Sequence, residues 1–272
     1  MRLGVMMMTS DLAMPVPELA RAAEERGFVS LFVPEHTHMP VERSRLGPVS
    51  EEGGELPEPY RRSLDPLVVL AAAASVTTVI RLGTAVLLPA QREPIVTAKA
   101  VATLDRLSGG RVVLGVGYGW NREEVENHGV PFGERRETVR RVVSRMRELW
   151  REEVAEFDGM TPSWSWPKPI SGPPVYIGGG AGPKLFAQIA EYADGWMPIG
   201  GSGLAAALPA LREACERAGR PMADVLPVGT LPTREKLDHL AGLGVEEVVA
   251  GLPSGPAEEV LPVLDAYAAA FL

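Results

Sequence analysis

The sequence has few of the residues that several specialised protein classes need. It holds one cysteine in 272 residues, Cys215, which excludes an internal disulfide and a structural zinc site built on cysteines. Aromatic residues make up only 6%, lysine occurs at four positions, and the net charge is -8. Because an acidic chain repels the phosphate backbone, we do not expect nucleic acid as a partner.

Long apolar runs are also missing. No window holds the roughly 18 consecutive apolar residues that a membrane helix requires. The longest candidate, residues 67–80, is Ala-rich and contains Ser and Thr. The first residues, MRLGVMMMTSD, show no basic segment followed by an apolar stretch of signal-peptide length. The sequence therefore predicts a cytoplasmic protein with no membrane segment.

Glycine and proline, by contrast, are abundant, with 29 and 25 residues. Many of them flank short apolar runs that alternate with helical patterns, with proline at helix starts and glycine just past helix ends. The predicted strands are 3–7, 30–33, 81–88, 111–116, 175–177, 195–198, 225–228 and 247–250. The predicted helices are 17–26, 66–77, 94–107, 134–153, 183–192, 204–218, 234–240 and 256–271.

Eight strand–helix units with nearly continuous apolar strands indicate a parallel sheet covered on both faces. In 272 residues they predict an α/β fold, a single (β/α)₈ TIM barrel over residues 1–272. An extended loop after the second strand, residues 37–64, and an insertion after the fourth helix, residues 155–174, interrupt the rhythm. The alternative is an open doubly wound sheet, which normally shows a glycine fingerprint after its first strand; residues 8–11 contain none.

In such a barrel the active site lies at the carboxyl ends of the strands. Glu35 and His36 follow the second strand, and a histidine there suits proton transfer near neutral pH; a purely structural histidine is the alternative. His36 and His38 form an H-x-H pair, but only His128 and His239 remain as further histidine ligands, so we expect no metal. None of the four lysines ends a strand, so no Schiff base is expected.

A glycine-rich segment after the fifth strand predicts a phosphate site. Gly178, Gly179, Gly180 and Ala181 lead into a predicted helix, and glycines allow close approach of a ligand to the backbone. The helix amino terminus adds free N–H groups and the positive end of its dipole. The alternative is a tight strand–helix turn. Pro183 stands where a Walker A loop needs glycine, so this segment is not one.

The fourth strand ends in a second group of glycines, Gly115, Gly117 and Gly119, with Tyr118 and Trp120 between and after them. Because Trp120 follows the third glycine, the order does not match the G-x-G-x-x-G fingerprint of nicotinamide-binding folds. Close approach of a flat ligand fits these glycines, with the two aromatic rings as walls. A barrel rim filled by two aromatic residues is the alternative.

Residues 82–150 resemble the luciferase-like oxidoreductases, which depend on a flavin or on the deazaflavin coenzyme F420. The segments that carry the resemblance are LGTAVLLPAQREPIVTAKAVATLDRLSGGRVVLGVGYGWNREEVENHGVPFGERRETVRRVVSRMRELW, LFVPEHTHMP and PVYIGGGAGPKLFAQIAEYADGWMPIG. Together they span most of the chain in the family's order. The excess of Arg over Lys suits a bacterium of high GC content, and the chain looks closest to the F420 branch.

The resemblance implies a barrel whose mouth holds the deazaflavin or isoalloxazine ring. Glu35 and His36 match the family's acidic–histidine pair, with His36 facing the ring and the substrate. Thr84, Ala85 and Leu87 lie in the strand behind the ring, where a non-prolyl cis peptide bond would fall at Thr84–Ala85.

The resemblance also implies that residues 117–120 line the ring and residues 178–181 hold its phosphate. The chain departs from the family at two positions. Trp120 replaces an acidic residue of the deazaflavin enzymes, and Pro40 replaces an aromatic residue found in some members. The acidic tail of F420 favours basic residues at the mouth, for which Arg92, Arg122 and Lys184 are candidates.

The expected function is hydride transfer between coenzyme F420 and a small organic substrate, with His36 as the proton donor. An FMN-dependent monooxygenase is the closest alternative, and a non-catalytic flavin-binding barrel or a metal-dependent barrel hydrolase are others. The sequence does not identify the substrate. Family members are often dimers, so the resemblance implies a homodimer.

Overall fold

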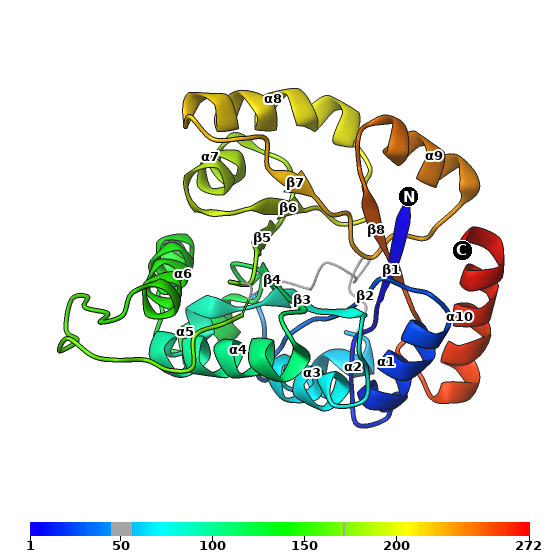
Figure 1. Cartoon of the computed structure of the whole chain (residues 1–272), viewed down its shortest axis with the longest axis horizontal. Coiled ribbons are helices and arrows are strands. Elements are labelled where there is room, and N and C mark those ends of the chain that lie inside the picture. The colour runs from blue at the N-terminus through cyan, green and yellow to red at the C-terminus, as the bar shows by residue number, and fades with distance from the viewer. Residues whose placement is uncertain (45–55, 171) are drawn as a thin grey trace.

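The structure is a computed structural model that describes residues 1–44, 56–170 and 172–272. Its strands are β1 (Arg2–Met6), β2 (Ser30–Val33), β3 (Arg81–Leu87), β4 (Val112–Val116), β5 (Val175–Gly178), β6 (Gly195–Met197), β7 (Asp224–Val225) and β8 (Glu247–Gly251). Its α-helices are α1 (Val16–Glu25), α2 (Glu58–Arg61), α3 (Pro66–Ala74), α4 (Pro94–Ser108), α5 (Arg122–Asn127), α6 (Arg135–Arg151), α7 (Pro183–Tyr192), α8 (Leu204–Arg217), α9 (Arg234–Gly242) and α10 (Ala257–Phe271). Figure 1 shows the strands at the centre with the helices around them.

The strands form one parallel sheet that closes almost completely into a barrel. Their order is β7-β6-β5-β4-β3-β2-β1-β8, so strands adjacent in sequence pair in space and β1 also pairs with β8. β7 and β8 share no regular ladder. The segment after β7 bridges them instead, because the N–H of Val249 donates to the carbonyl of Pro227 at 2.8 Å and that of Thr230 donates to Val249 at 3.1 Å. The predicted (β/α)₈ barrel is confirmed, and the open doubly wound alternative is wrong.

Local signals explain several helix boundaries. Asp65 caps α3 by accepting hydrogen bonds from the N–H groups of Leu67 and Val68 at 2.9 and 3.1 Å. Gly109 ends α4 with a φ of 72°, in the left-handed conformation that glycine adopts without strain. The short helices α2 and α5 lie in segments where the sequence pattern predicted no element. Both follow strands at the carboxyl end of the barrel, and both contribute to the site described below.

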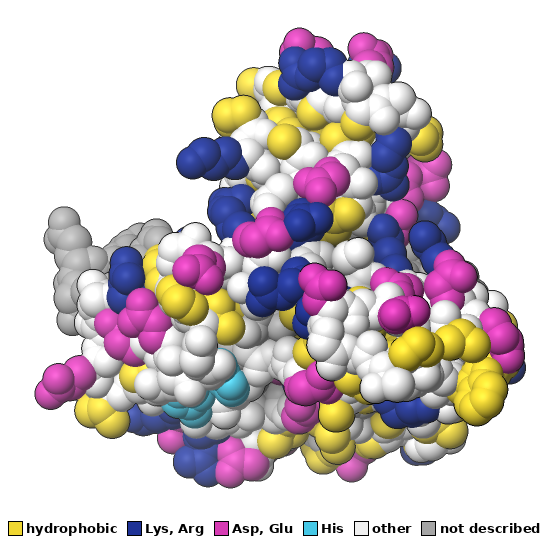
Figure 2. Space-filling model, turned by 90° about the vertical axis from the view of Figure 1, so that its left-hand side faces the viewer, with side chains coloured by type: hydrophobic (Ala, Val, Ile, Leu, Met, Phe, Trp, Pro, Cys, Tyr) yellow, Lys and Arg dark blue, Asp and Glu magenta, His cyan; other side chains and the backbone are white. Residues whose placement is uncertain are grey.

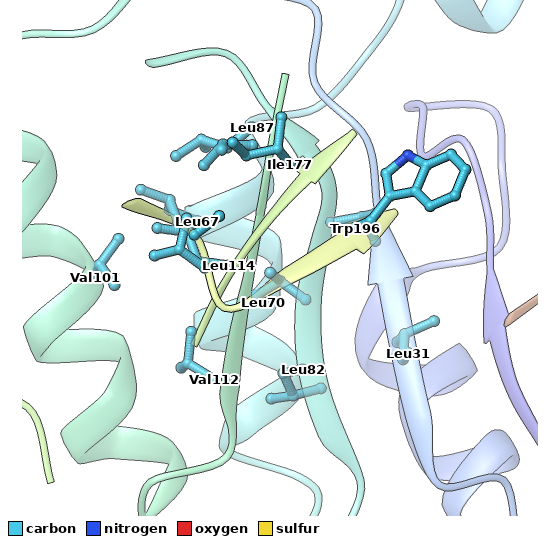
Figure 3. Close-up of a cluster of buried hydrophobic side chains, with 14 of the residues drawn as sticks. Leu31, Leu67, Leu70, Leu82, Leu87, Val101, Val112, Leu114, Ile177 and Trp196 are labelled. Atoms are coloured by element: carbon cyan, nitrogen blue, oxygen red, sulfur yellow. The ribbon is translucent and has the colours of Figure 1, made fainter. Parts of the chain in front are cut away.

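Alternate strand residues fill the barrel interior and leave its mouth apolar. Buried side chains inside the barrel are Phe32, Val113, Tyr176, Met197, Leu226, Val228 and Val249. Met6, Ala85 and Val86 pack against this cluster but stay partly exposed, near the carboxyl ends of β1 and β3. A larger cluster lies between the strands and the helices, and Figure 3 shows part of it around Leu114 and Trp196. The barrel therefore presents an apolar floor at its carboxyl-terminal mouth.

Two predictions about the strands were wrong in detail. The non-prolyl cis peptide bond lies at Ala85–Val86, one residue beyond the predicted Thr84–Ala85. It falls where the register between β3 and β4 shifts, between Thr84 and Leu87. The seventh strand was predicted over residues 225–228, but its ladder covers only Asp224–Val225; after it, Val228 makes an isolated parallel bridge to Ile199 and Thr230 makes one to Ala250 of β8.

The insertion after α6 lies on the amino-terminal side of the barrel, away from the mouth. The Lys168 ammonium donates to the carbonyl of Leu149 at 2.8 Å, and Arg106 of α4 donates to the carbonyl of Lys168 at 2.7 Å. Trp164 in this insertion is 74% exposed. Of the predicted loop 37–64, residues 45–55 lie outside the described residues. Its described parts contain α2 and the chain that follows β2.

The charged surface is mixed rather than divided by sign. Figure 2 shows Lys and Arg beside Asp and Glu over one face of the molecule. On α6, Arg140 pairs with Glu137 and Glu191, and Arg147 pairs with Asp194. Within the described ranges, no helix combines the length and the apolar character needed to cross a membrane.

Candidate active site at the barrel mouth

His36 occupies the carboxyl end of β2 and is only 8% exposed. Its Nδ1 lies 2.9 Å from Oε2 of Glu124, a fully buried carboxylate on α5. An ionised carboxylate only accepts hydrogen bonds, so Nδ1 carries the hydrogen and the tautomer is assigned from this contact. Nε2 makes no hydrogen bond to any described residue. His36 therefore presents a nitrogen that can accept or, when protonated, donate a proton.

Glu124 is held in place from several sides. Its Oε1 accepts hydrogen bonds from the backbone N–H of Thr37 at 2.9 Å and from the Thr37 hydroxyl at 3.3 Å. Its own N–H donates to the Asn121 side chain, which caps α5. Burial raises the pKa of Glu124, but the hydrogen bonds from His36 and Thr37 outweigh it and hold the pKa below its usual value. Glu124 is therefore ionised at neutral pH.

Glu35, predicted to act with His36, points away from it. Its carboxylate accepts hydrogen bonds from the N–H of Leu88 at 2.6 Å and from Nε of Arg92 at 2.7 Å. Arg92 also donates to Asp65 at 2.6 Å. Burial raises the pKa of Glu35, and Arg92 opposes that shift. The pair joins the end of β2 to the connection after β3. Arg92 is thus committed to carboxylates of this chain rather than free for a coenzyme tail.

Two aromatic rings pack against His36 and against each other. The Trp120 ring centroid lies 5.6 Å from that of His36, the Tyr60 centroid lies 5.3 Å from it, and the two outer rings are 6.5 Å apart. Tyr60 comes from α2, which the sequence pattern did not reveal. Tyr118, predicted as a second wall, is placed elsewhere. Its hydroxyl donates to Gln188 at 2.6 Å and its ring lies under Arg136, so it faces α6 and α7.

The glycines after β4 and β5 serve mainly to accommodate β3. A Cβ on Gly117 would lie 2.4 Å from Cγ2 of Val86, and one on Gly178 would lie 2.7 Å from Cγ1 of the same residue. A Cβ on Gly115 would meet the carbonyl oxygen of Thr84 at 2.1 Å. Because these three positions carry no side chain, β3 has room to bulge toward the mouth. The three glycines are therefore explained by packing within the barrel rather than by contact with a ligand.

Of the predicted cofactor contacts on β3, only one side chain faces the mouth. The Thr84 hydroxyl is buried and donates to the carbonyl of Gly115 at 2.7 Å. Leu87 is fully buried in the cluster under the helices. Ala85 is partly exposed above the barrel interior, together with Val86. Val86, which the sequence argument did not single out, is therefore the prominent β3 side chain at the mouth.

The segment after β5 keeps the open geometry of an anion site. A Cβ on Gly180 would meet nothing within 4 Å, and Gly180 and Ala181 are exposed. Gly179 has a φ of 154°, and its carbonyl accepts a hydrogen bond from Nε1 of Trp196 at 2.8 Å. Among the described residues no side chain caps the amino terminus of α7, which leaves its first-turn N–H groups available, with the exposed Lys184 beside them.

Buried polar atoms without partners lie at the carboxyl ends of three strands. They are Thr9 Oγ1 after β1, Gln91 Nε2 after β3 and Thr230 Oγ1 after β7, none of which meets a partner among the described residues. Gln91 is 7% exposed and the two threonines are fully buried. Buried polar groups in proteins are nearly always hydrogen-bonded, so such atoms point to ligand contacts at the mouth.

The predicted H-x-H pair does not converge on one site. His38 and His128 lie near the surface with ring centroids 5.5 Å apart, and both contact the Thr37 hydroxyl, at 3.0 and 2.8 Å. In the part of the chain that the structure describes, no group of three or more His, Cys, Asp or Glu side chains is arranged to hold a metal.

Comparison with known proteins places this geometry in a family. The model of the luciferase-like monooxygenase family matches residues 2–233. An uncharacterised protein of Mycobacterium tuberculosis is 41% identical over 276 residues, covering 99% of this chain and 98% of that protein. An F420-dependent glucose-6-phosphate dehydrogenase of Nakamurella multipartita is 35% identical over 215 residues, covering 75% of this chain and 58% of that enzyme.

Solved structures share the fold. A monooxygenase from Streptomyces bottropensis superposes with a TM-score of 0.80 at 19% identity, covering 100% of this chain and 98% of the other. An F420-dependent secondary alcohol dehydrogenase superposes with a TM-score of 0.77 at 19% identity, covering 99% and 98%. The family match covers most of the barrel, including β2, β4 and the segment after β5 that build the mouth. The chain belongs to the luciferase-like monooxygenase family.

Proposed function

We propose that the chain is an oxidoreductase that transfers a hydride between coenzyme F420 and an organic alcohol or carbonyl compound. The observation that carries the proposal is His36, which follows β2 at the mouth: a buried carboxylate holds its Nδ1, while its Nε2 makes no hydrogen bond to a described residue. Relatives named as F420-dependent glucose-6-phosphate dehydrogenases are 35% identical to this chain, which supports the deazaflavin over FMN. The substrate itself differs among such relatives and neighbours.

The residues at the mouth fit a phosphorylated tricyclic ring. Met6, Ala85 and Val86 offer an apolar floor on which a flat ring can rest. The open backbone around Gly180 and the uncapped amino terminus of α7 suit its phosphate. The partnerless Nε2 of Gln91 is a buried donor that a carbonyl or phosphate oxygen would satisfy. These features support binding of either a deazaflavin or a flavin.

When bound, the deazaflavin would supply or accept the hydride. The chain's own residues would bind, orient and move one proton. Nε2 of His36 would hold the substrate oxygen, taking its proton as an alcohol is oxidised and returning one as a carbonyl is reduced. Tyr60 and Trp120, which pack against His36 and against each other, would confine the substrate and exclude water.

Titration of the purified protein with F420 and FMN, followed by fluorescence and absorbance, tests the cofactor. A panel of alcohols and carbonyl compounds, followed by the F420 absorbance, tests the reaction. His36→Ala should keep its affinity for F420 while turnover falls by about 10²–10⁴-fold, the usual contribution of a proton-transferring side chain. Tight FMN binding with none of F420 would overturn the cofactor assignment, and unchanged turnover would remove His36 from the mechanism.

An FMN-dependent monooxygenase is the second candidate, because the family model carries that activity in its name and a monooxygenase has a TM-score of 0.80. Oxygen consumption with reduced FMN separates the two candidates. Stoichiometric cofactor binding without turnover on any substrate would instead indicate a non-catalytic flavin-binding barrel.

A further inference from the structure

Glu124 and His36 form a hydrogen-bonded carboxylate–imidazole pair whose carboxylate is held in a fixed position. Glu124 is fully buried, and its Oε2 lies 2.9 Å from Nδ1, the ring nitrogen opposite the one available at the mouth. Thr37 binds its other oxygen, and Asn121 binds its backbone N–H. The carboxylate therefore has no route to a substrate at the mouth. It reaches the reacting atoms only through the imidazole of His36.

Other acidic groups do not take this position. Position 120, an acidic residue in deazaflavin enzymes that the chain resembles, holds Trp120, whose ring centroid lies 5.6 Å from that of His36. Glu35 is the neighbour of His36 in sequence, but its carboxylate is bonded to Leu88 and Arg92. Among the described residues, Glu124 is the carboxylate that hydrogen-bonds His36. The negative charge of this site thus comes from α5.

We propose that Glu124 is the positioning residue of His36. It fixes the tautomer with hydrogen on Nδ1, directs Nε2 to the mouth, and stabilises the imidazolium that forms when Nε2 takes a proton. The inference rests on the proposed function and names how that site is organised. It gives the short helix α5, anchored by the Asn121 cap, a part in the reaction.

The proton step balances without a proton on Glu124. In alcohol oxidation the substrate O–H bond would break and its proton would form an N–H bond at Nε2, while the C–H bond would break to give the hydride that a bound deazaflavin would accept. Nδ1 keeps its hydrogen throughout, so the imidazolium lies beside an ionised carboxylate. Carbonyl reduction reverses each step. After release of the product, Nε2 returns its proton to water at the mouth.

The tautomer can be read without any cofactor. The chain has four histidines, His36, His38, His128 and His239, so ¹⁵N spectra of the ring nitrogens can be assigned with single His→Gln variants. In the wild type we expect His36 with hydrogen on Nδ1 and a bare Nε2 in its neutral form. Glu124→Leu should remove this preference. An unchanged His36 tautomer in that variant would overturn the proposal, whether or not the chain turns over F420.

Kinetics provide the second readout. Glu124→Gln keeps the shape but removes the charge, so kcat should fall by roughly 10–100-fold, as for other groups that orient a functional histidine. KM and the Kd for F420 should stay within about twofold, because Glu124 does not face the mouth. Glu124→Asp should recover part of kcat. Glu123→Gln is the matched control, since the Glu123 carboxylate accepts a hydrogen bond from the N–H of Ser44 and makes none to His36 among the described residues, and it should keep wild-type kcat.

The outcomes separate the two proposals. A wild type that reduces no F420, combined with a His36 tautomer that depends on Glu124, contradicts the proposed function alone. A wild-type kcat in Glu124→Gln, with F420 turnover present, contradicts the positioning role alone. Far-UV circular dichroism and urea unfolding of each variant test whether the fold is intact. With an intact fold, a loss of kcat is attributed to the active site.

Discussion

Gly117 should tolerate a side chain only when Val86 is shortened. A Cβ at residue 117 would lie 2.4 Å from Cγ2 of Val86 and 3.5 Å from Cδ2 of Leu88. The first separation is far inside the optimum of about 3.5–4.0 Å for two carbon atoms. Overpacking of this kind costs about 1–3 kcal/mol. We therefore expect Gly117→Ala to lower the free energy of unfolding by that amount.

A double-mutant cycle isolates the clash. Val86→Ala removes two methyl groups from a partly exposed side chain and should cost about 1 kcal/mol by itself. Combined with Gly117→Ala it removes the clash, so the double variant should be about 1–2 kcal/mol more stable than the sum of the single effects. Gly180→Ala is the control, since its Cβ would meet nothing within 4 Å, and its effect should stay within about 0.5 kcal/mol. Urea unfolding measures all four variants, and purely additive effects would show that Val86 does not clash with a side chain at position 117.

Three further outcomes follow from the contacts. Arg92→Met leaves the Glu35 carboxylate buried without its charged partner and should destabilise the chain by roughly 3–5 kcal/mol in urea unfolding. The folded-state pKa of Glu124 lies below the ordinary 4.5, so its ionised form adds stability at higher pH that is lost as pH falls through the folded-state value. The stability difference between the wild type and Glu124→Gln should therefore shrink below about pH 4.5. Thr233→Ala removes the cap of α9, in which the hydroxyl accepts from the N–H of Lys236, and should lower the midpoint of thermal unfolding, at a cost of about 1 kcal/mol.

The barrel could be predicted from the sequence because its signals are local. Apolar runs with helical crossovers define parallel strands, and residues such as Asp65 and Gly109 mark helix ends by their own backbone preferences. The bounds of β7 were predicted wrongly because its ladder is only two residues long and passes into isolated bridges at Val228 and Thr230, a pairing that no local pattern encodes. The predicted position of the cis peptide bond was off by one residue for a similar reason, since the bond lies where the register between β3 and β4 shifts.

The site was only partly predictable because its contacts join distant segments. His36 and Trp120 end strands, and the barrel brings such ends together, so their meeting follows from the fold. Glu124 lies 88 positions from His36 on a short helix whose only local signal is the Asn121 cap. Glu35 precedes His36 in the sequence and was therefore predicted as its acidic partner. In the structure its carboxylate instead accepts a hydrogen bond from Arg92.

The role of the glycines at the strand ends was also only partly predictable from the sequence. Glycine-rich strand ends predict a ligand that approaches the backbone, yet Gly117 and Gly178 make room for Val86, a residue on another strand. Only Gly180, with open space around it, keeps the geometry of a ligand cradle. A sequence pattern identifies where side chains are missing, whereas the structure shows which neighbour occupies the space.

The central claim is that His36 serves hydride transfer with a deazaflavin at the barrel mouth. The most direct test mixes F420 anaerobically with the wild type or His36→Ala and a series of secondary alcohols, and follows the F420 absorbance. We expect both proteins to bind F420 and only the wild type to reduce it at an appreciable rate. Failure of both proteins to bind F420, or equal reduction by both, would contradict it.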